Sequence, residues 1–147
     1  MKQVQKILFP VDLTEKIDPL LPWVTTLVEK FDATLIVLFV TQDLASFTSF
    51  YMPHPHIKSM QEEALKAAQQ KMEEVRQQYF QDFKKVETRV VQGDPAAKIL
   101  EVAQKEGVDL IIMGTHGRKG LERAIFGSVC DKVVRNSKIP VLTIYPQ

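Results

Sequence analysis

The sequence has a single cysteine, Cys130, and almost no excess of either charge: nineteen basic and eighteen acidic residues give a formal net charge of +1. One cysteine cannot form a disulfide within the chain. A balanced charge produces no long-range field that would attract nucleic acid or an anionic membrane surface. We therefore expect neither a structural disulfide nor a nucleic-acid partner.

Long apolar runs are also absent, because charged residues, Pro or Gly interrupt every hydrophobic stretch within a few positions. A membrane-spanning helix needs about 20 consecutive apolar residues. The opening MKQVQKILFPVD has no basic region followed by an apolar run and a small-residue cleavage site. These absences predict a soluble cytoplasmic protein without membrane association. The length of 147 residues predicts one domain over residues 1–147.

Short apolar runs rich in β-branched residues predict the strands. The runs LIVLFV and LIIM are continuous rather than alternating, which is typical of strands in a parallel sheet that is covered on both faces. The runs lie at residues 7–11, 35–40, 86–91, 110–113 and 141–145.

Helical patterns lie between these runs. Asp18 followed by Pro19 predicts the cap and first residue of one helix, whose apolar face continues to residue 31. The longest predicted helix begins at Ser59, and its helical spacing places Met60 and Met72 in the core.

A second cap signal is formed by Asp94 and Pro95, and Gly107 is placed to end that helix in a left-handed turn. The alternation of strands and helices predicts an α/β fold, a single doubly wound parallel sheet with helices on both faces. Ligands of such sheets bind at the carboxyl ends of the strands. The long connection at residues 41–56 is a candidate lid or a mobile loop.

The most informative segment follows the fourth predicted strand. It contains Gly114, Gly117 and then, after nine intervening residues, Gly127 and Ser128 at the start of another helix. Glycines allow close backbone approach to an anion, and the N–H groups of a helix start favour phosphate. Arg118 adds positive charge nearby. The spacing is neither a P-loop nor a Rossmann fingerprint.

The series Gly114-x2-Gly117-x9-Gly127-Ser128 resembles the nucleotide-binding signature of the universal stress protein family, in its ATP-binding branch. The opening KILFPVDLTE and the segment GDPAAKILEVAQKEGVDLIIMG also resemble that family. The resemblance covers nearly the whole chain, most weakly between residues 41 and 83. It implies an open five-stranded sheet in the order 3-2-1-4-5.

The resemblance also implies a set of ATP-binding positions. The Asp12 carboxylate would bind the nucleoside, and the backbone of Val40 would contact the adenine edge. Divalent Mg²⁺ or Mn²⁺ would bridge phosphate oxygens, with no dedicated protein site. The full set is Pro10, Val11 and Asp12 at the adenosine, Val40 at the adenine, Met113 and Gly114 at the ribose, and Gly117, Arg118, Gly127, Ser128 and Val129 at the phosphates.

Several of these residues have simpler interpretations. Asp12 is also a candidate cap for the first helix or turn. His54 and His56 lack a neighbouring Cys/His set and are expected to be polar loop residues rather than metal ligands. His116 is expected to be structural or a phosphate donor. The lone Cys130 falls in the apolar pattern of the last helix, so burial is expected.

The predicted function is that of an ATP-binding stress-response or regulatory protein acting through nucleotide occupancy, with slow hydrolysis left open. The cleft offers one carboxylate and no second group for a base and nucleophile pair, so no catalytic residue is assigned. One alternative is an adenylyl-transfer or ATP pyrophosphatase-like enzyme, although DLTEKID replaces the phosphate motif expected after its first strand. Another is a nucleotide-free dimeric interaction module.

The last apolar run, PVLTIY, predicts a sheet edge with no Lys or internal Pro to discourage pairing. The family resemblance implies pairing through this strand. We therefore expect a homodimer in which residues 141–145 of two copies lie antiparallel.

Overall fold

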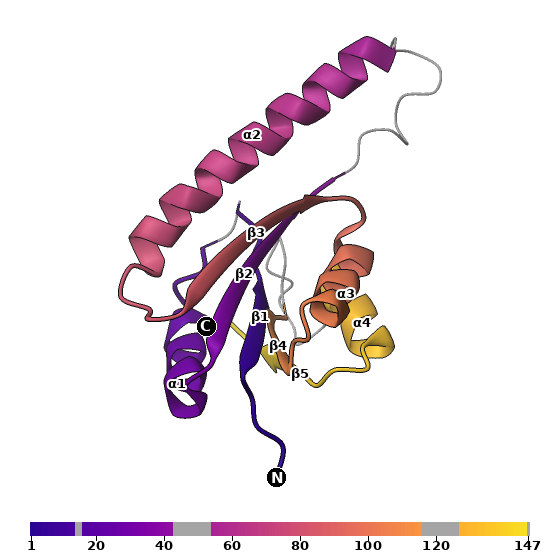
Figure 1. Ribbon diagram of the computed structural model, residues 1–147. Coiled ribbons are helices and arrows are strands. Elements are labelled where there is room, and N and C mark those ends of the chain that lie inside the picture. The colour runs from indigo at the N-terminus through magenta and orange to yellow at the C-terminus, as the bar shows by residue number, and fades with distance from the viewer. Residues whose placement is uncertain (14–15, 43–53, 116–126, 147) are drawn as a thin grey trace.

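In this computed structural model, residues 1–13, 16–42, 54–115 and 127–146 are described. Five strands form one parallel sheet in the order β3-β2-β1-β4-β5 (Figure 1). This confirms the predicted topology, and each strand lies within one residue of its expected bounds. The strands are β1 (Lys6–Pro10), β2 (Thr34–Thr41), β3 (Val86–Gln92), β4 (Leu110–Gly114) and β5 (Val141–Ile144).

Four helices cover the sheet in two layers. One face carries α1 and α2, and the other carries α3 and α4 (Figure 1). This arrangement confirms the doubly wound α/β class. The helices are α1 (Leu21–Phe31), α2 (His54–Tyr79), α3 (Pro95–Lys105) and α4 (Ser128–Asn136). None of them, within the part of the chain that is described, is long and apolar enough to cross a bilayer.

The core is divided between the two faces of the sheet. In β1 the side chains of Ile7 and Phe9 pack toward α1 and α2, whereas Leu8 packs toward α3 and α4. All three are fully buried. Continuous apolar runs form these strands because alternate side chains must fill two separate apolar layers.

Helix α1 begins later than the Asp18–Pro19 signal predicts. Its first residue is Leu21, and Pro22 occupies the first turn. A proline lacks an N–H group and has a fixed φ, so it fits the first turn and disrupts a helix interior. The Asp18 carboxylate instead accepts a hydrogen bond from the Tyr79 hydroxyl at 3.2 Å, which joins the approach to α1 to the end of α2.

Helix α2 begins at His54, five residues before the predicted start at Ser59. Its second half packs on the sheet, and Met72 is buried there. Its first half extends past the sheet (Figure 1), and Met60 is 44% exposed. The expectation that Met60 lies in the core is therefore wrong, because helical periodicity identifies a face but not how far the sheet beneath it extends.

The end signals of α3 match the prediction. The Asp94 carboxylate accepts a hydrogen bond from the Ala97 N–H at 3.0 Å, and Pro95 is in the first turn. After the helix, Gly107 has φ of +67°, the left-handed conformation expected there.

Candidate functional site

The winding of the sheet reverses between β1 and β4. These two strands are parallel neighbours, with Ile7 paired to Leu110 and Leu8 paired to Ile111. The chain leaves β1 toward α1 on one face, whereas α4 follows β4 on the other face. The carboxyl ends of β1 and β4 therefore flank the position where doubly wound sheets bind their ligands.

The residues predicted at the adenosine end follow β1 and β2. Pro10 ends β1, and the N–H of Val11 donates to the Leu38 carbonyl at 2.8 Å, so β1 and β2 stay paired to this point. Asp12 comes next and is half-buried. It does not cap α1, whose N-cap residue is Leu20. Val40 lies near the same edge, at the end of β2.

At the end of β4, Met113 and Gly114 occupy the neighbouring position in the sheet. The Met113 side chain is only 6% exposed and packs in the apolar cluster that also holds Val40 and Val129. Any contact of Met113 with a ligand is thus expected through its backbone. This cluster places one predicted residue from each of β2, β4 and α4 in a single contiguous region.

The start of α4 is attached to the end of β4. The N–H of Gly127 donates to the carbonyl of Thr115 at 2.7 Å. Gly127 is the N-cap residue, and no side chain caps this helix. The N–H groups of Ser128 and Val129, in the first turn, have no intrahelical acceptor. Together with the N–H of Cys130, which also precedes the first intrahelical bond from the Asp131 N–H to the Gly127 carbonyl, they are the backbone donors at the start of α4. The Gly127 N–H is already used.

Thr115 is a residue of this site that the sequence interpretation did not single out. It follows Gly114 and is 6% exposed. Its side-chain oxygen is buried and has no hydrogen-bond partner within the described ranges. The signal available in the sequence was a hydroxyl residue between the two glycines of Gly114-x2-Gly117.

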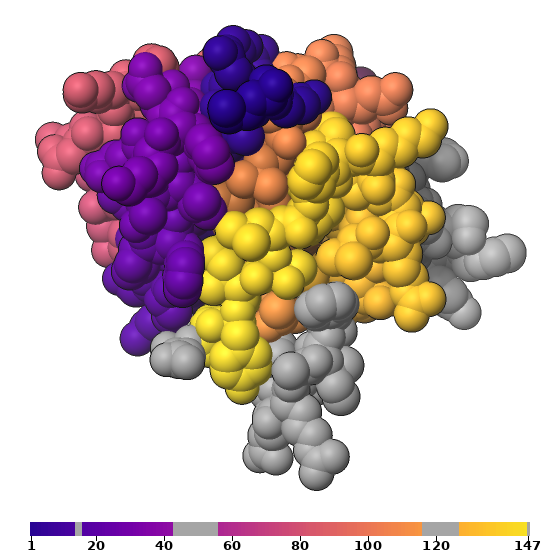
Figure 2. Space-filling view, turned by 90° about the horizontal axis from the view of Figure 1, so that it is seen from below, coloured from indigo at the N-terminus to yellow at the C-terminus, as the bar shows by residue number. Residues whose placement is uncertain are grey.

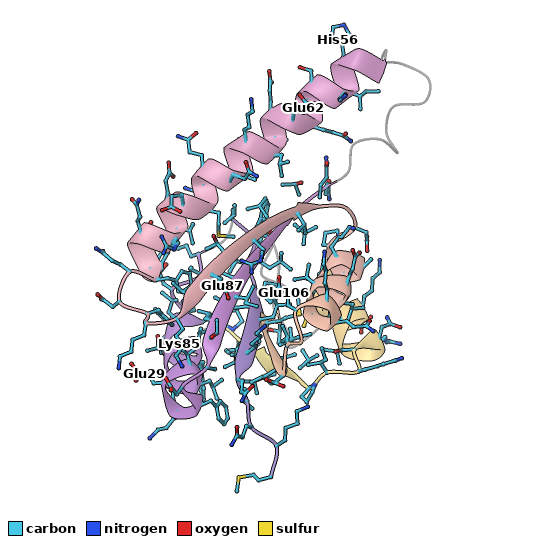
Figure 3. The ribbon with its side chains drawn as sticks, viewed as in Figure 1. Glu29, His56, Glu62, Lys85, Glu87 and Glu106 are labelled. Atoms are coloured by element: carbon cyan, nitrogen blue, oxygen red, sulfur yellow. The ribbon has the colours of Figure 1, made fainter. Side chains whose placement is uncertain are left out.

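The described part of the chain does not include every predicted feature. Gly117, Arg118, His116 and the segment 43–53 of the proposed lid lie outside the described residues. His54 and His56 were expected in a loop, but both lie in the first turn of α2, and His56 is exposed at the far end of that helix (Figure 3). The described parts of the chain contain no group of three or more His, Cys, Asp or Glu side chains that would hold a metal ion.

Cys130 lies in the first turn of α4 and is 3% exposed, as expected. Burial, with a smaller contribution from the charge of Asp131, raises the pKa of its thiol to about 11. The thiol is therefore protonated and poorly nucleophilic at neutral pH. It belongs to the core rather than to the chemistry of the site.

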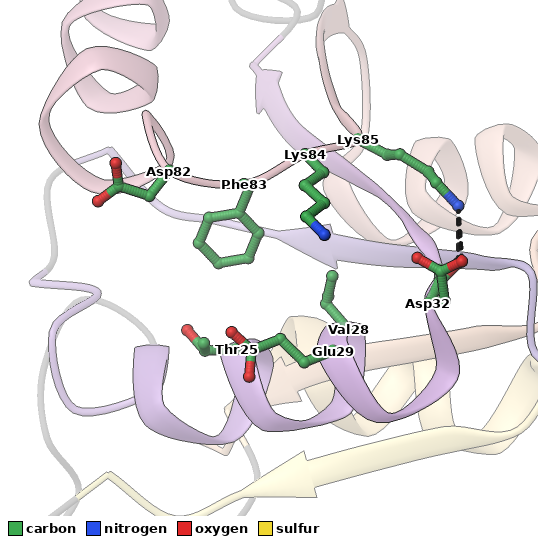
Figure 4. Close-up of a pocket in the computed structure, with 9 residues that line it drawn as sticks. Thr25, Val28, Glu29, Asp32, Asp82, Phe83, Lys84 and Lys85 are labelled. Atoms are coloured by element: carbon green, nitrogen blue, oxygen red, sulfur yellow. Dashed lines mark hydrogen bonds and ion pairs between the residues drawn. The ribbon is translucent and has the colours of Figure 1, made fainter.

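A separate groove of about 310 Å³ lies between the second half of α1 and the segment before β3 (Figure 4). Lys85 crosses one end of it, with its Nζ 3.2 Å from an Asp32 carboxylate oxygen. Asp32 and Lys85 precede the amino ends of β2 and β3. The groove is therefore at the opposite edge of the sheet from the predicted site, and none of the predicted residues line it.

Comparisons with known proteins agree with this architecture. The family described as Universal stress protein family matches residues 3–144. Universal stress protein MJ0531 of Methanocaldococcus jannaschii is 31% identical over 141 residues, covering 95% of this chain and 81% of that protein. The solved structure of MJ0577 from the same organism has a TM-score of 0.83 at 28% identity, covering 99% of both chains.

A solved universal stress protein in complex with cAMP shares the fold, with a TM-score of 0.60 at 20% identity over 98% of each chain. The family match spans nearly all of the sequence, and the solved structure of MJ0577 shares the fold over nearly the whole chain. The chain belongs to the universal stress protein family.

Proposed function

We propose that this protein binds ATP at the carboxyl ends of β1, β2 and β4 and acts in the cytoplasm as a regulatory or stress-response protein through nucleotide occupancy. The observation that carries the proposal is the start of α4. This helix begins without a side-chain cap, and its first turn is attached to the end of β4, beside the point where the winding reverses. Such a helix start favours phosphate.

The nucleoside is placed by the strands. Asp12 extends from the end of β1 to accept hydrogen bonds from the sugar, and the Val40 backbone contacts the adenine edge. The backbone of Met113 and Gly114 lies along the ribose. These roles follow the family resemblance, and the positions of Pro10, Val11 and Asp12 at one sheet edge support them.

The phosphates are held by Gly127, Ser128 and Val129, together with Gly117 and Arg118. The Gly127 N–H is bonded to Thr115. Gly127 therefore contributes close approach without a side chain, while Ser128 and Val129 supply the N–H donors. Mg²⁺ or Mn²⁺ bound through the phosphates and water fits this set, because such ions often take few protein ligands.

The site has the properties of a binding site more than those of a fast hydrolase. Asp12 is the one carboxylate that the described residues place among the predicted contacts. A hydrolase needs a group that activates water and others that stabilise the leaving phosphate. We therefore propose that the protein acts through the presence or absence of bound nucleotide, with at most slow hydrolysis. A relative of the same fold in complex with cAMP supports adenine nucleotides as the ligand class.

We further propose a homodimer formed through β5, with no nucleic-acid partner. β5 is an edge strand of the sheet. Leu142 is 36% exposed and Tyr145 is 47% exposed along this edge. Figure 2 shows the C-terminal residues at the surface beside α1. An unprotected apolar edge strand is a favourable surface for antiparallel pairing with a second copy.

Calorimetric titration tests nucleotide binding. Nucleotide-stripped protein is titrated with ATP and Mg²⁺, and a Gly117→Val, Gly127→Val double variant is titrated in parallel. At Gly127 φ is −58° and ψ is 159°, values open to valine, so the added side chain obstructs the ligand without straining the backbone there. We expect binding by the natural protein and loss of binding by the folded variant.

Circular dichroism and a melting curve confirm that the variant is folded. Addition of cAMP to the ATP complex then shows whether the two nucleotides compete for one site. If the natural protein gives no heat and no thermal stabilisation at millimolar ATP, the nucleotide proposal is wrong and the dimeric interaction module replaces it.

A further inference from the structure

Trp23 is the single tryptophan of the chain, and it lies on the surface of α1. It is 57% exposed, whereas the next residue, Val24, is fully buried against the sheet. Tryptophan is among the side chains with the largest apolar surface to bury, and it is typical of protein–protein interfaces. Covering the sheet therefore does not explain a tryptophan at this position of the helix.

The helical position of Trp23 places it on the side of α1 that is nearer to β5. Consecutive residues of a helix are about 100° apart around its axis. Thr25, one residue after the buried Val24, lines the groove on the side of α2 and β3. Trp23, one residue before Val24, is therefore on the other side of the helix. Leu27, one turn after Trp23, packs on the apolar cluster that contains Ile144 of β5, and Figure 2 shows the C-terminal residues beside α1.

The face of β5 that is turned toward α1 also has an exposed apolar residue. Side chains alternate along a strand. Ile144 belongs to the cluster beneath α1 and α2, whereas Val141 packs against the cluster beneath α3 and α4. Leu142 is therefore on the α1 face, and it is 36% exposed. Trp23 from a helix and Leu142 from a strand thus form one apolar surface, the Trp23 surface, at the open edge of the sheet.

Pairing of β5 alone would make a small interface. The strand has four residues, which corresponds to a length of about 13 Å. Stable protein–protein interfaces bury about 800 Å² on each partner, from about 20 residues a side. A dimer through β5 therefore needs further surface beside the strand, and the Trp23 surface adjoins it.

The symmetry of such a dimer determines which surfaces meet. When two edge strands pair antiparallel and continue one sheet, the two-fold axis between them is perpendicular to the sheet. The same face of the sheet then carries α1 in both copies. The two α1 helices run antiparallel to each other across the paired β5 strands, and the side of each that carries Trp23 is turned toward the other copy.

We propose that the Trp23 surface docks on the Trp23 surface of a second copy of this chain. The dimer interface then consists of the paired β5 strands and of the two α1 helices, with Trp23 as the buried aromatic anchor of each copy. The inference rests on the proposed homodimer through β5 and adds to it a contact made by side chains of α1.

Sedimentation of Trp23→Ala tests the energetic part of the proposal. Met60→Ala is the matched control, because Met60 is also exposed, at 44%, but lies on the part of α2 that extends past the sheet (Figure 1). We expect the dimer dissociation constant of W23A to be at least about 10-fold higher than that of the natural protein, since an aromatic anchor is lost. The constant of M60A should stay within a factor of about 3, and circular dichroism checks that both variants are folded.

Quenching of tryptophan fluorescence by acrylamide tests the geometric part, because Trp23 is the single tryptophan of the chain. It is measured on the natural dimer and on Thr143→Pro, which removes an N–H from β5. We expect acrylamide to quench Trp23 less in the dimer than in monomeric T143P.

The outcomes separate this inference from the proposed dimer. Equal quenching in the natural dimer and monomeric T143P, or an unchanged dissociation constant of W23A, would overturn the docking of α1 and leave the pairing of β5 intact. A natural protein that sediments as a monomer, or a T143P protein that remains a dimer, would overturn both.

Discussion

Asp109 shows how a single carboxylate fixes the start of the central strand. Its Oδ2 accepts the backbone N–H of Gln5 at 2.9 Å and that of Lys6 at 3.1 Å. The Gln5 hydrogen bond is the largest influence and lowers the pKa of Asp109. The Lys6 N–H and the charges of Lys2 and Lys6 act in the same direction, while burial opposes them.

We predict that Asp109→Ala lowers the free energy of unfolding by about 1 to 3 kcal/mol at pH 7. The folded pKa of Asp109 lies below its unfolded value, so its stabilisation is present above the unfolded pKa, about 4. It is lost as the pH falls through the folded pKa. Urea unfolding between pH 7 and pH 3 measures the free energies of unfolding of D109A and the natural protein. The difference between them should therefore become smaller as the pH falls.

Asp82→Ala serves as the matched control, because Asp82 is exposed and makes no hydrogen bond or ion pair with another described residue. The free energy of unfolding of this variant should stay within about 0.5 kcal/mol of that of the natural protein at every pH. If the difference in free energy of unfolding between D109A and the natural protein did not change with pH, the charge of the Asp109 carboxylate would contribute nothing to stability.

Single residues also mark how far the sequence predicted the site. Gly127 and Ser128 were identified because glycine and a hydroxyl at a helix start are local signals, and α4 does begin there. Thr115 was missed because its significance depends on tertiary burial and on the hydrogen bonds that its backbone makes to two other elements. Neither property is encoded in the spacing of the motif.

At the scale of elements, β5 presents one hydrogen-bonding side to β4 and the other to solvent. The N–H of Ile111 donates to the Pro140 carbonyl, and the N–H of Thr115 donates to the Ile144 carbonyl. In a parallel ladder successive residues alternate between the two sides. The backbone of Leu142 therefore faces β4, whereas that of Thr143 faces the open edge.

This alternation sharpens the test of the proposed dimer. Thr143→Pro removes an N–H at the open edge, where proline is tolerated within a monomer. We expect T143P to sediment as a monomer and to retain the secondary structure of the natural protein. The variant should bind a second copy more weakly, because an antiparallel partner strand accepts a hydrogen bond from the Thr143 N–H.

Leu142→Pro is the comparison variant. It removes a donor that faces β4, so it should weaken the β4–β5 pairing and lower the melting temperature more than T143P does. A T143P protein that sediments as a dimer at the same concentrations as the natural protein would disprove pairing through β5.

The elements also show where local signals are insufficient. Strand positions followed from short runs rich in β-branched and apolar residues, which are typical of strands that pack on one or both faces. The start of α1 could not be predicted in this way, because Pro19 and Pro22 are both typical of a first helical turn. The helical hydrogen bonds that begin with the Val24 N–H to the Leu20 carbonyl show that Pro22 is the one in the first turn. The exposure of Met60 depends on how far α2 extends past the sheet (Figure 1).

At the scale of the whole molecule, the two edges of the sheet differ in chemistry. The carboxyl edge holds Asp12, Gly114 and the uncapped start of α4. The amino edge holds the groove of Figure 4, which is lined by side chains of both charges, among them Glu29 and Lys84. The topology and family followed from the sequence, whereas the existence of this second concave surface did not, because its lining residues are far apart in the chain.

Nuclear magnetic resonance tests the central claim most directly, by following the backbone amide signals during a titration with ATP and Mg²⁺. The account predicts that the signals of Asp12, Gly114 and Ser128 shift together and saturate, while those of Glu29 and Lys84 in the groove do not move. Shifts confined to the groove, or none at millimolar ATP, would contradict nucleotide binding at the carboxyl ends of the strands.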